Sequence, residues 1–556
     1  MRSATGRSAR RCATMDVVPP HPQPRAETAD AVIIGAGHHG LVAAAVLADA
    51  GWDVVVLEAR DRVGGAVASV ERDGWVMDEF SACHPLAAAS PVLRELALED
   101  LGLRWRRSGT VLSHAGSPDD PEGAALFAEP SRTAAALAEE SPADGQTWLD
   151  LVTDYRRIRE PLLDALLTRW PPVSPGLRLA RTVGLGELPR LARFLMLPTT
   201  QMGEELFRGQ RGRMLLAGNA MHADIPPDAP GSGVFGWLMS MLAQDVGFPS
   251  PEGGSARLAE ALADRARRSG ATIEVGQAVT RIEVRGGRAH AVLTAGGRRV
   301  IGRRAVIADT SAPALYQRLL PEASVPQRLR DDLQRFRWDL PTVKLNYRLR
   351  HTLPWTARTA RTAGVVHVGA DVAGLIDWQA DLSTGRVPRK PFALVGQMTT
   401  IDPTRSPAGT EAMWLYTHLP RGVDDDRSAD ELTAHVEDIL ETFAPGWREA
   451  VIDRWVQRPG DLETADANLG EGGVGGGTQQ LFQQLVFRPV PGLGGPRTPV
   501  ANLYLGSAAI HPGGGVHGAC GYLAARAALA DNAWWGRPRQ QLSLRALHHL
   551  YRRPAH

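Results

Sequence analysis

The sequence predicts an α/β protein in which a parallel-sheet domain carries an inserted second lobe. Three observations lead to this prediction. Residues 31–59 read as a buried strand, a helix and a second buried strand. Residues 342–419 are rich in strand patterns that fit a mixed or antiparallel sheet. Residues 502–530 return to a strand, a glycine-rich loop and a helix. A chain of 556 residues is long enough to bury two or three such domains.

The composition is that of an ordinary globular protein, with 44% apolar and 22% charged residues. A formal net charge of +1 gives no whole-chain field that would attract nucleic acid or an anionic membrane. The cysteines, Cys12, Cys83 and Cys520, are too far apart for a disulfide framework or a Cys-x-x-Cys pair. They favour a reducing compartment, so we expect a cytoplasmic protein. Residues 1–28 lack the apolar core of a secretory signal and are expected to form a disordered tail.

The sharpest unit is the stretch 31–59, AVIIGAGHHGLVAAAVLADAGWDVVVLEA. Apolar and β-branched residues form its two strands, and small apolar residues form a helix that ends at Gly51. This order makes a parallel βαβ unit. Its glycines and histidines argue against reading the uncharged run 31–48 as a membrane span, so we predict no transmembrane segment. Contact of residues 195–197 with a membrane surface stays open.

The turn between the first strand and the helix has the spacing Gly35-x-Gly37-x-x-Gly40. Such glycines allow a tight turn, a close approach of backbone to a pyrophosphate, and close packing of helix on strand. The free N–H groups of the helix N-terminus then attract phosphate. Glu58 ends the second strand, where a carboxylate binds ribose hydroxyls and disfavours a 2′-phosphate. The unit therefore predicts binding of FAD or NAD.

The middle of the chain is first helical in pattern and then mixes helix and strand patterns. Residues 155–245 show helical spacing. A further helix is expected between the candidate N-cap Ser255 and the stop signal Gly270, followed by a hairpin over 278–294. The other expected elements are a loop over 107–123, a strand over 303–310, a helix over 429–445 and a glycine-rich loop over 469–480.

These elements divide the chain into seven segments. We expect a disordered tail (1–28), the first part of a nucleotide-binding domain (29–150), a mainly helical cap (151–250), the second part of the nucleotide-binding domain (251–320), a sheet-containing substrate domain (321–465), the third part of the nucleotide-binding domain (466–535) and a C-terminal tail (536–556).

Two separated motifs resemble those of one enzyme family. EARDRVGGAVASV, which continues from Glu58, resembles the E-x-R-x-x-x-GG run of amine-oxidase and phytoene-desaturase FAD enzymes. HPGGGVHGACGYLAARAAL, from His511, resembles their C-terminal flavin motif. The resemblance runs from about residue 29 to residue 530. Within the family, the sequence resembles the branch that includes the pyridine nucleotide-disulphide oxidoreductase domain-containing 2 proteins. One departure is Ala66, where many members have arginine.

The resemblance implies FAD as the cofactor and a Rossmann-like FAD-binding domain of the GR2 type, with an inserted mixed-sheet and helical substrate domain. It also implies that a substrate hydride passes to flavin N5. Val279 would meet the adenine, and the glycines after Pro512 would lie against the flavin ring. The implied FAD-binding residues are Gly35, Gly37, His39, Gly40, Glu58, Ala59, Arg60, Gly64, Gly65, Ala66, Val279, Gly506, Ser507, Gly514, Gly515 and Val516.

Three residues are candidates for proton transfer or flavin contact. His511 and His517 flank the glycine run, although His511 also suits a chain turn and His517 could face solvent. Lys344 lies among apolar strand residues, where it could approach the flavin or sit on a solvated strand face. His367 and His418 are interpreted as core or surface histidines.

The adjacent histidines His38 and His39 fill the two positions before Gly40. The backbone there faces the pyrophosphate, so we interpret the pair as scaffolding, although an imidazole could touch the flavin side. Cys83 and His84 match no nucleophile motif. No group of residues shows metal-ligand spacing, and we predict no metal site.

The leading functional hypothesis is an FAD-dependent dehydrogenase, desaturase or oxidase that acts on a hydrophobic organic molecule, for example in bacterial secondary metabolism. A second nucleotide motif for NAD(P)H is missing, so oxygen or a quinone-like molecule is the expected electron acceptor. A redox-neutral flavin-dependent isomerase and a flavin-binding interaction protein are the alternatives. The oligomeric state is not indicated.

Overall fold

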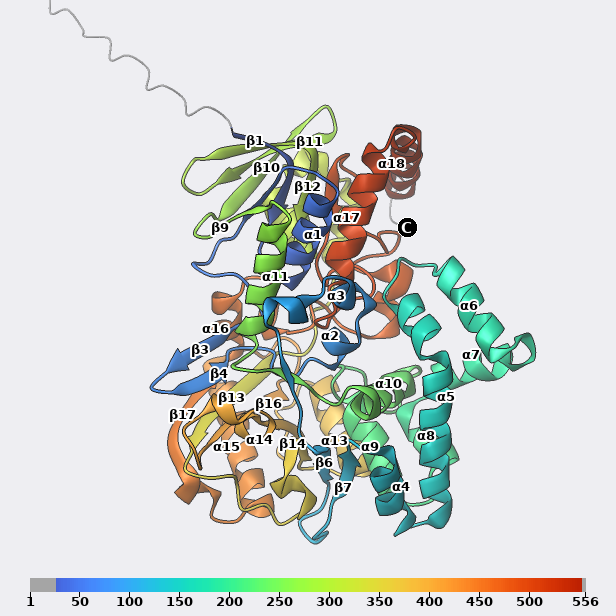
Figure 1. The fold of residues 1–556 in the computed structure, drawn as a ribbon, viewed down its shortest axis with the longest axis vertical. Coiled ribbons are helices and arrows are strands. Elements are labelled where there is room, and N and C mark those ends of the chain that lie inside the picture. The colour runs from blue at the N-terminus through green and yellow to red at the C-terminus, as the bar shows by residue number, and fades with distance from the viewer. Residues whose placement is uncertain (1–26, 553–556) are drawn as a thin grey trace, which may run out of the picture.

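The computed structural model describes residues 27–552 (Figure 1). The predicted N-terminal tail therefore lies outside the described residues, except for Glu27 and Thr28, which begin the first strand. Cys12 also lies outside them. Figure 1 shows one sheet at the top and a second at the bottom, with a group of helices beside the lower sheet. This α/β arrangement confirms the predicted fold class.

The first sheet has the strand order β10-β11-β12-β1-β2-β9, and β18 also pairs with β12. β1, β2, β9, β12 and β18 run parallel, whereas β10 and β11 form the predicted hairpin beside β12. The strands are β1 (Glu27–Ile34), β2 (Val54–Leu57), β9 (Thr272–Glu274), β10 (Val279–Arg285), β11 (Arg288–Thr294), β12 (Arg299–Ala308) and β18 (Leu503–Leu505). The sheet thus unites both ends of the chain, as the sequence predicts.

Three helices cover one face of this sheet: α1 (His38–Asp49), α11 (Ala256–Arg268) and α17 (Ala519–Asn532) (Figure 1). Two glycines make their close packing possible. A Cβ on Gly40 would lie 2.2 Å from the carbonyl oxygen of Gly35, and one on Gly521 would lie 1.9 Å from that of His39. Helix α1 therefore packs directly on both its own strand and α17, which brings the N-terminal and C-terminal motifs together.

The second sheet has the order β17-β13-β16-β15-β14-β6-β7 and is antiparallel except between β14 and β6. Its strands are β6 (Thr110–Ala115), β7 (Ala124–Phe127), β13 (Thr342–Leu349), β14 (Ala363–Val368), β15 (Ala393–Gln397), β16 (Glu411–His418) and β17 (Val451–Gln457). The predicted mixed sheet is present. The sequence interpretation assigned 107–123 to a loop of the first domain, whereas β6 joins the second sheet through a long-range parallel pairing.

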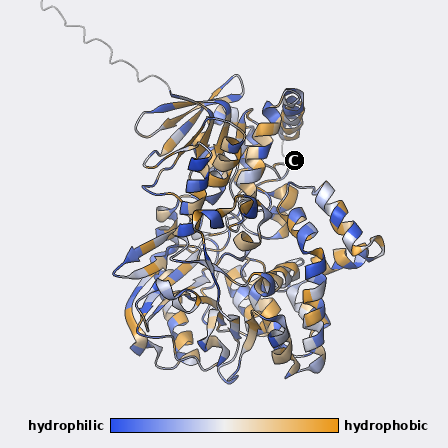
Figure 2. Ribbon diagram, in the orientation of Figure 1, coloured by the Kyte–Doolittle hydropathy of each residue, from blue (hydrophilic) through white to orange (hydrophobic). Residues whose placement is uncertain are grey.

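The helical stretch expected over 155–245 is also present. Figure 2 shows apolar and polar residues intermixed along the outer helices. Among residues 27–552, no helix is both long and apolar enough to cross a membrane. The helices of this region are α5 (Pro142–Leu166), α6 (Val173–Val183), α7 (Leu188–Met196), α8 (Thr199–Leu206), α9 (Gln210–Ala220) and α10 (Ser232–Asp245).

The remaining strands and helices lie outside the two large sheets and the helical stretch. They are β3 (Ser69–Arg72), β4 (Trp75–Asp78), β5 (Trp105–Arg106), β8 (Ser250–Pro251), α2 (Pro85–Ala89), α3 (Pro91–Glu95), α4 (Pro130–Ala138), α12 (Gln327–Leu333), α13 (Val372–Ser383), α14 (Met398–Ile401), α15 (Asp426–Phe443), α16 (Pro459–Ala465) and α18 (Gly536–Arg552). Helix α18 occupies most of the segment that the sequence interpretation treated as a C-terminal tail. The other proposed domain boundaries stay predictions.

Helix α11 begins after Ser255 as predicted, but the serine hydroxyl does not cap it. The Ser255 hydroxyl donates to the carbonyl oxygen of Ser81 at 2.7 Å and lies 3.0 Å from Nε2 of His84. The side chain is therefore used to hold the segment before α2. Gly270 ends the helical region with a φ of +102°, as a stop signal should.

Candidate functional site

A cavity of about 950 Å³ is lined by residues of both sheets and of both predicted motifs. This volume is at the upper end of the range for small-molecule and cofactor sites. The predicted site residues on its wall are Gly35, Gly37, His39, Glu58, Ala59, Arg60, Gly65, Ala66, Val279, Lys344, Ser507, Gly514, Gly515 and Val516. Gly40, Gly64, Gly506, His511 and His517 are not on the wall.

The glycine turn at the start of α1 leaves almost no room for side chains. Gly35 has a φ of +96°, and a Cβ there would lie 2.9 Å from the carbonyl oxygen of Asp309. A Cβ on Gly37 would lie 2.6 Å from Oδ2 of the same residue. The turn therefore presents bare backbone at the N-terminus of α1, the geometry that binds phosphate groups.

Asp309 was not predicted. It follows β12 directly, is buried, and accepts a hydrogen bond from the Gly40 N–H at 2.8 Å. Burial raises the pKa of Asp309 to about 8, and the nearby carboxyls of Asp466 and Glu58 act in the same direction. The sequence offered one signal for Asp309. The residue comes at the carboxyl end of a strand that runs parallel to β1, where ligands often bind.

Glu58 lies at the end of β2, as the sequence predicts. Its Oε2 accepts from the Ala36 N–H at 2.6 Å and its Oε1 from the Arg60 N–H at 2.8 Å. Burial raises the pKa of Glu58, and these two hydrogen bonds oppose the shift. The carboxylate is thus held rigidly at the cavity wall. Gly64 lies behind it, where its N–H donates to the carbonyl oxygen of Ala36 at 2.8 Å.

The C-terminal loop forms another part of the wall. Ser507 donates its hydroxyl hydrogen to the carbonyl oxygen of Thr310 at 2.6 Å, and its oxygen accepts from the Ala509 N–H at 3.2 Å. Gly506 packs against Ile307 and Ala524 behind the wall. A Cβ on Gly514 would lie 2.5 Å from the carbonyl oxygen of Gly475, so the loop lies directly on the glycine-rich stretch that precedes it.

Two buried side chains fix that glycine-rich stretch. Arg488 is fully buried and donates only to backbone carbonyl groups, including those of Gly475 at 3.1 Å and Thr478 at 3.0 Å. From the other side, Asp339 accepts from the N–H groups of Gly475 at 2.5 Å and Gly477 at 3.1 Å. The predicted loop is therefore a clamped part of the cavity wall.

His511 and His517 lie behind the glycine loop. Nδ1 of His517 accepts from the Ala519 N–H at 3.1 Å, so Nε2 carries the hydrogen and donates to the Gly513 carbonyl oxygen at 3.2 Å. Burial lowers the pKa of His517 to about 3 and that of His511 to about 4. The solvent-facing alternative for His517 is wrong, because its side chain is buried. Their proton-transfer roles stay predictions.

Lys344 reaches the cavity wall from β13. Its Nζ donates to the carbonyl oxygens of Asp78 at 2.6 Å and Glu79 at 3.3 Å, and to Oδ1 of Asn346 at 2.7 Å. Lys344 is buried, so the alternative of a solvated strand face is wrong. Burial lowers its pKa to about 8, within reach of neutral pH.

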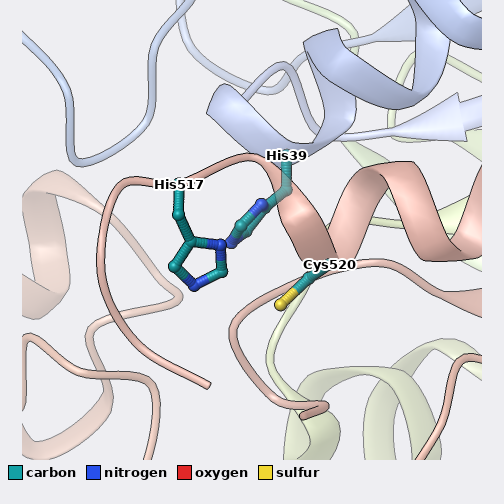
Figure 3. A group of neighbouring side chains, drawn as sticks. All are labelled: His39, His517 and Cys520. Carbon is teal, nitrogen blue, oxygen red and sulfur yellow. The ribbon is translucent and has the colours of Figure 1, made fainter. Parts of the chain in front are cut away.

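Figure 3 shows His39 and His517 side by side, with Cys520 next to them. Their potential ligand atoms lie within 4.8 Å of one another. Both nitrogens of His517 are already used by backbone groups, and burial raises the pKa of the Cys520 thiol to about 12. We therefore assign no metal to this trio. His39 keeps two buried ring nitrogens without a hydrogen-bond partner in the described structure.

Several unpaired polar atoms at the wall test whether a dinucleotide cofactor fits. They include both ring nitrogens of His39, Nε2 of His38, Nη1 of Arg60 and Oγ1 of Thr310. Buried polar groups normally have partners, so these atoms indicate a polar ligand. Together with the bare glycine turn and the held carboxylate of Glu58, they fit FAD.

The part of the cavity lined by His222, Phe248, Trp414, Tyr416 and His418, which we call the chamber, is aromatic and rich in histidine. Trp414 and Tyr416 stack with ring centroids 5.8 Å apart, and Phe248 packs beside His222 at 5.8 Å. Burial lowers the pKa values of His222 and His418 to about 4, so both are uncharged at neutral pH. The sequence analysis did not single out His222, because nothing in its local pattern marks it. His367 is a core histidine, as interpreted.

The family model for flavin containing amine oxidoreductases matches residues 40–529. A pyridine nucleotide-disulfide oxidoreductase domain-containing protein 2 of Rattus norvegicus is 28% identical, over 90% of this chain and 93% of its own length. A zeta-carotene-forming phytoene desaturase of Myxococcus xanthus is 26% identical, over 87% and 90%. An oxidoreductase from Methanosarcina mazei has a similar structure, with a TM-score of 0.58, 16% identity, and coverage of 90% and 99%.

Proposed function

Because the chain belongs to the flavin containing amine oxidoreductase family, we propose that this FAD-dependent oxidoreductase dehydrogenates or oxidises a largely apolar, uncharged organic molecule. The observation that carries the proposal is the continuity of one cavity. Its wall joins the glycine turn and the C-terminal glycine loop to the aromatic, neutral chamber. A cofactor and an apolar substrate can therefore share one space.

FAD supplies the redox chemistry, since its N5 accepts a hydride from the substrate. The protein's part is to bind, orient and exclude water. Gly35, Gly37 and Glu58 would hold the dinucleotide end, and Gly514 and Gly515 would lie against the ring. Lys344 is the predicted catalytic candidate that reaches the cavity wall.

The chamber supports an uncharged substrate over a cationic one. Its histidines are neutral, and Asp224, the nearest carboxylate to them along the chain, pairs with Arg421 and accepts from Thr478 at 2.7 Å. An ammonium group would thus find no free carboxylate at Asp224. The phytoene desaturase among the relatives favours the same substrate class.

The test is anaerobic reduction of the bound flavin. The purified holoenzyme is mixed without oxygen with a panel of uncharged apolar molecules and, for comparison, aliphatic amines. We expect an uncharged molecule to bleach the flavin absorbance, and reoxidation by oxygen or a quinone to complete the cycle. Bleaching by amines alone would contradict the proposed substrate class.

The same mixtures separate the alternatives. A redox-neutral isomerase would turn substrate over with reduced flavin and no electron acceptor. A flavin-binding interaction protein would not bleach with any molecule. The chamber is part of a cavity and not an exposed apolar patch, which favours an enzyme over a binding surface. A cytoplasmic location and a role in secondary metabolism stay part of this proposal.

A further inference from the structure

Three histidines from separate elements form a cluster that reaches from the buried interior to the chamber. His222 follows α9, His367 lies on β14 and His114 lies on β6. The ring of His222 lies on the cavity wall, and its exposed surface faces the cavity. His367 and His114 are fully buried. β14 and β6 run parallel with His367 opposite His114, which fixes the cluster in the sheet.

The hydrogen bonds of the cluster allow one continuous direction of proton transfer. Nε2 of His114 lies 2.8 Å from the carbonyl oxygen of Ala370, so this nitrogen carries the hydrogen and Nδ1 of His114 is free to accept. Nε2 of His222 lies 3.1 Å from Nε2 of His367. If His222 donates there, then His367 carries its own hydrogen on Nδ1.

The two remaining nitrogens face the same small gap. Nδ1 of His114 and Nδ1 of His367 are buried without a hydrogen-bond partner in the described structure. They lie 2.4 and 2.5 Å from the position that a Cβ on Gly218 would occupy. Only a residue without a side chain leaves this gap open. The two rings lie edge to face with centroids 5.5 Å apart, so proton transfer between them requires a ring rotation into the gap.

We propose that His222 accepts the proton released when the substrate is oxidised, and that His367 and His114 carry it away from the chamber. This assignment rests on the proposed function.

Oxidation of a C–H bond next to a second C–H, O–H or N–H bond forms a double bond and releases two hydrogens. One hydrogen leaves with its electron pair as a hydride to the flavin, and the other leaves as a proton. The proton goes to Nδ1 of His222, the hydrogen on Nε2 of His222 passes to His367, and the hydrogen on Nδ1 of His367 passes to His114. His114 holds the proton until oxygen or a quinone reoxidises the flavin, and the reverse transfers then return it to the chamber, where the reduced acceptor takes it up.

The surroundings support this direction. Burial lowers the pKa values of all three imidazoles, so each is a free base at neutral pH. Phe248 packs on His222, and Phe392 packs on both other rings. The carboxylate of Asp371 raises the pKa of His114 and so favours a proton at the far end of the cluster.

A first experiment needs no substrate. The holoenzyme with ¹⁵N-labelled histidine is studied by NMR, with each signal assigned from single His→Phe variants. We expect hydrogen on Nε2 of His222, Nδ1 of His367 and Nε2 of His114. Hydrogen on Nε2 of His367 would reverse the chain and overturn the proposal.

A second experiment measures flavin reduction in variants. The His222→Phe variant should keep its flavin spectrum and its reduction by dithionite, but reduction by the substrate found in the anaerobic screen should slow by about 10²–10⁴-fold. His114→Phe and Gly218→Ala should slow it by about tenfold. His351, which is exposed and outside the cluster, supplies the matched control His351→Phe.

The outcomes are distinct. Substrate reduction within about twofold of wild type in His222→Phe overturns the proposal, because a general base contributes far more. If no molecule in the screen reduces the flavin, the proposed function fails, and the NMR tautomers alone then decide the direction of the chain.

Discussion

The two ends of the cavity are built in opposite ways. The dinucleotide end combines a bare glycine turn with three buried carboxyls, those of Glu58, Asp309 and Asp466, whose pKa values burial raises. The chamber has aromatic rings and neutral histidines, whose pKa values burial lowers. Burial thus pushes both sets toward their uncharged forms, although one set is acidic and the other basic.

The difference indicates that the two ends of the cavity bind different molecules. The dinucleotide end must bind an anionic pyrophosphate, so any neighbouring carboxyl has to be neutral or hydrogen-bonded to backbone N–H groups. The chamber must receive an apolar molecule and exclude water, so its histidines are uncharged and its carboxylate Asp224 is paired with Arg421. The following changes test this contrast, from the largest expected effect to the smallest.

Gly37→Val should remove FAD binding almost entirely. The side chain would collide with Oδ2 of Asp309, 2.6 Å from the new Cβ, and would cover the backbone that phosphate needs. We expect a Kd for FAD at least about 100-fold higher by flavin fluorescence titration. Gly186→Val is the matched control, because no atom lies near that glycine. Unchanged FAD affinity in Gly37→Val would contradict the role of the bare glycine turn in binding the cofactor.

Glu58→Gln should weaken FAD binding by about 10- to 100-fold, since a hydrogen bond to a charged group is worth about 1.5–3 kcal/mol. The same titration measures the effect. The carboxylate holds two backbone N–H groups, so thermal unfolding must be followed in parallel. Unchanged affinity at unchanged stability would remove Glu58 from the cofactor site.

Asp309 should make FAD binding depend on pH. Its pKa of about 8 lies far above the usual aspartate value, so the carboxyl is neutral below pH 8 and ionised above it. An ionised carboxylate repels the pyrophosphate, and FAD affinity should fall by up to about tenfold per pH unit above pH 8.

The raised pKa also has a stability consequence of definite sign. The neutral form is favoured in the folded state, so the stability that it contributes is present at low pH and is lost as pH rises through about 8. Asp309→Asn should flatten both the FAD affinity profile and the stability profile. A wild-type affinity that stays constant from pH 7 to 9.5 would contradict this account.

His39→Ala should have the smallest effect and should leave FAD bound. The backbone of the turn, rather than the imidazole, is expected to meet the pyrophosphate. The unpaired ring nitrogens of His39 leave room for one hydrogen bond to the cofactor, so a loss of up to about tenfold in affinity is consistent with our interpretation. Complete loss of the flavin would show that His39 is an essential ligand.

The sequence predicted the dinucleotide end well and the chamber poorly, for a physical reason. Gly35, Gly37, Gly40 and Glu58 lie within one βαβ unit, so their spacing along the chain reflects their spacing in space. Asp309 comes from a strand that joins β1 only through tertiary pairing. Local spacing therefore could not indicate it.

The chamber depends on pairings between distant segments. His222, His367 and His114 come from a helix end and two strands, and the parallel pairing of β14 with β6 has no local sequence signal. The expected loop over 107–123 shows the same limit, because it contains strand β6. Lys344 was a candidate because it is a lysine among apolar strand residues, but the sequence left a solvated strand face open, and only the fold places it at the cavity wall.

The most direct test of the account is an experimental structure of the FAD-loaded protein. We predict the pyrophosphate at the N-terminus of α1, the adenine beside Val279 and the flavin ring against Gly514 and Gly515, with its open face toward Trp414 and Tyr416. A flavin ring that lies at Glu58, or a chamber filled by the adenine end, would contradict the assignment of the two ends.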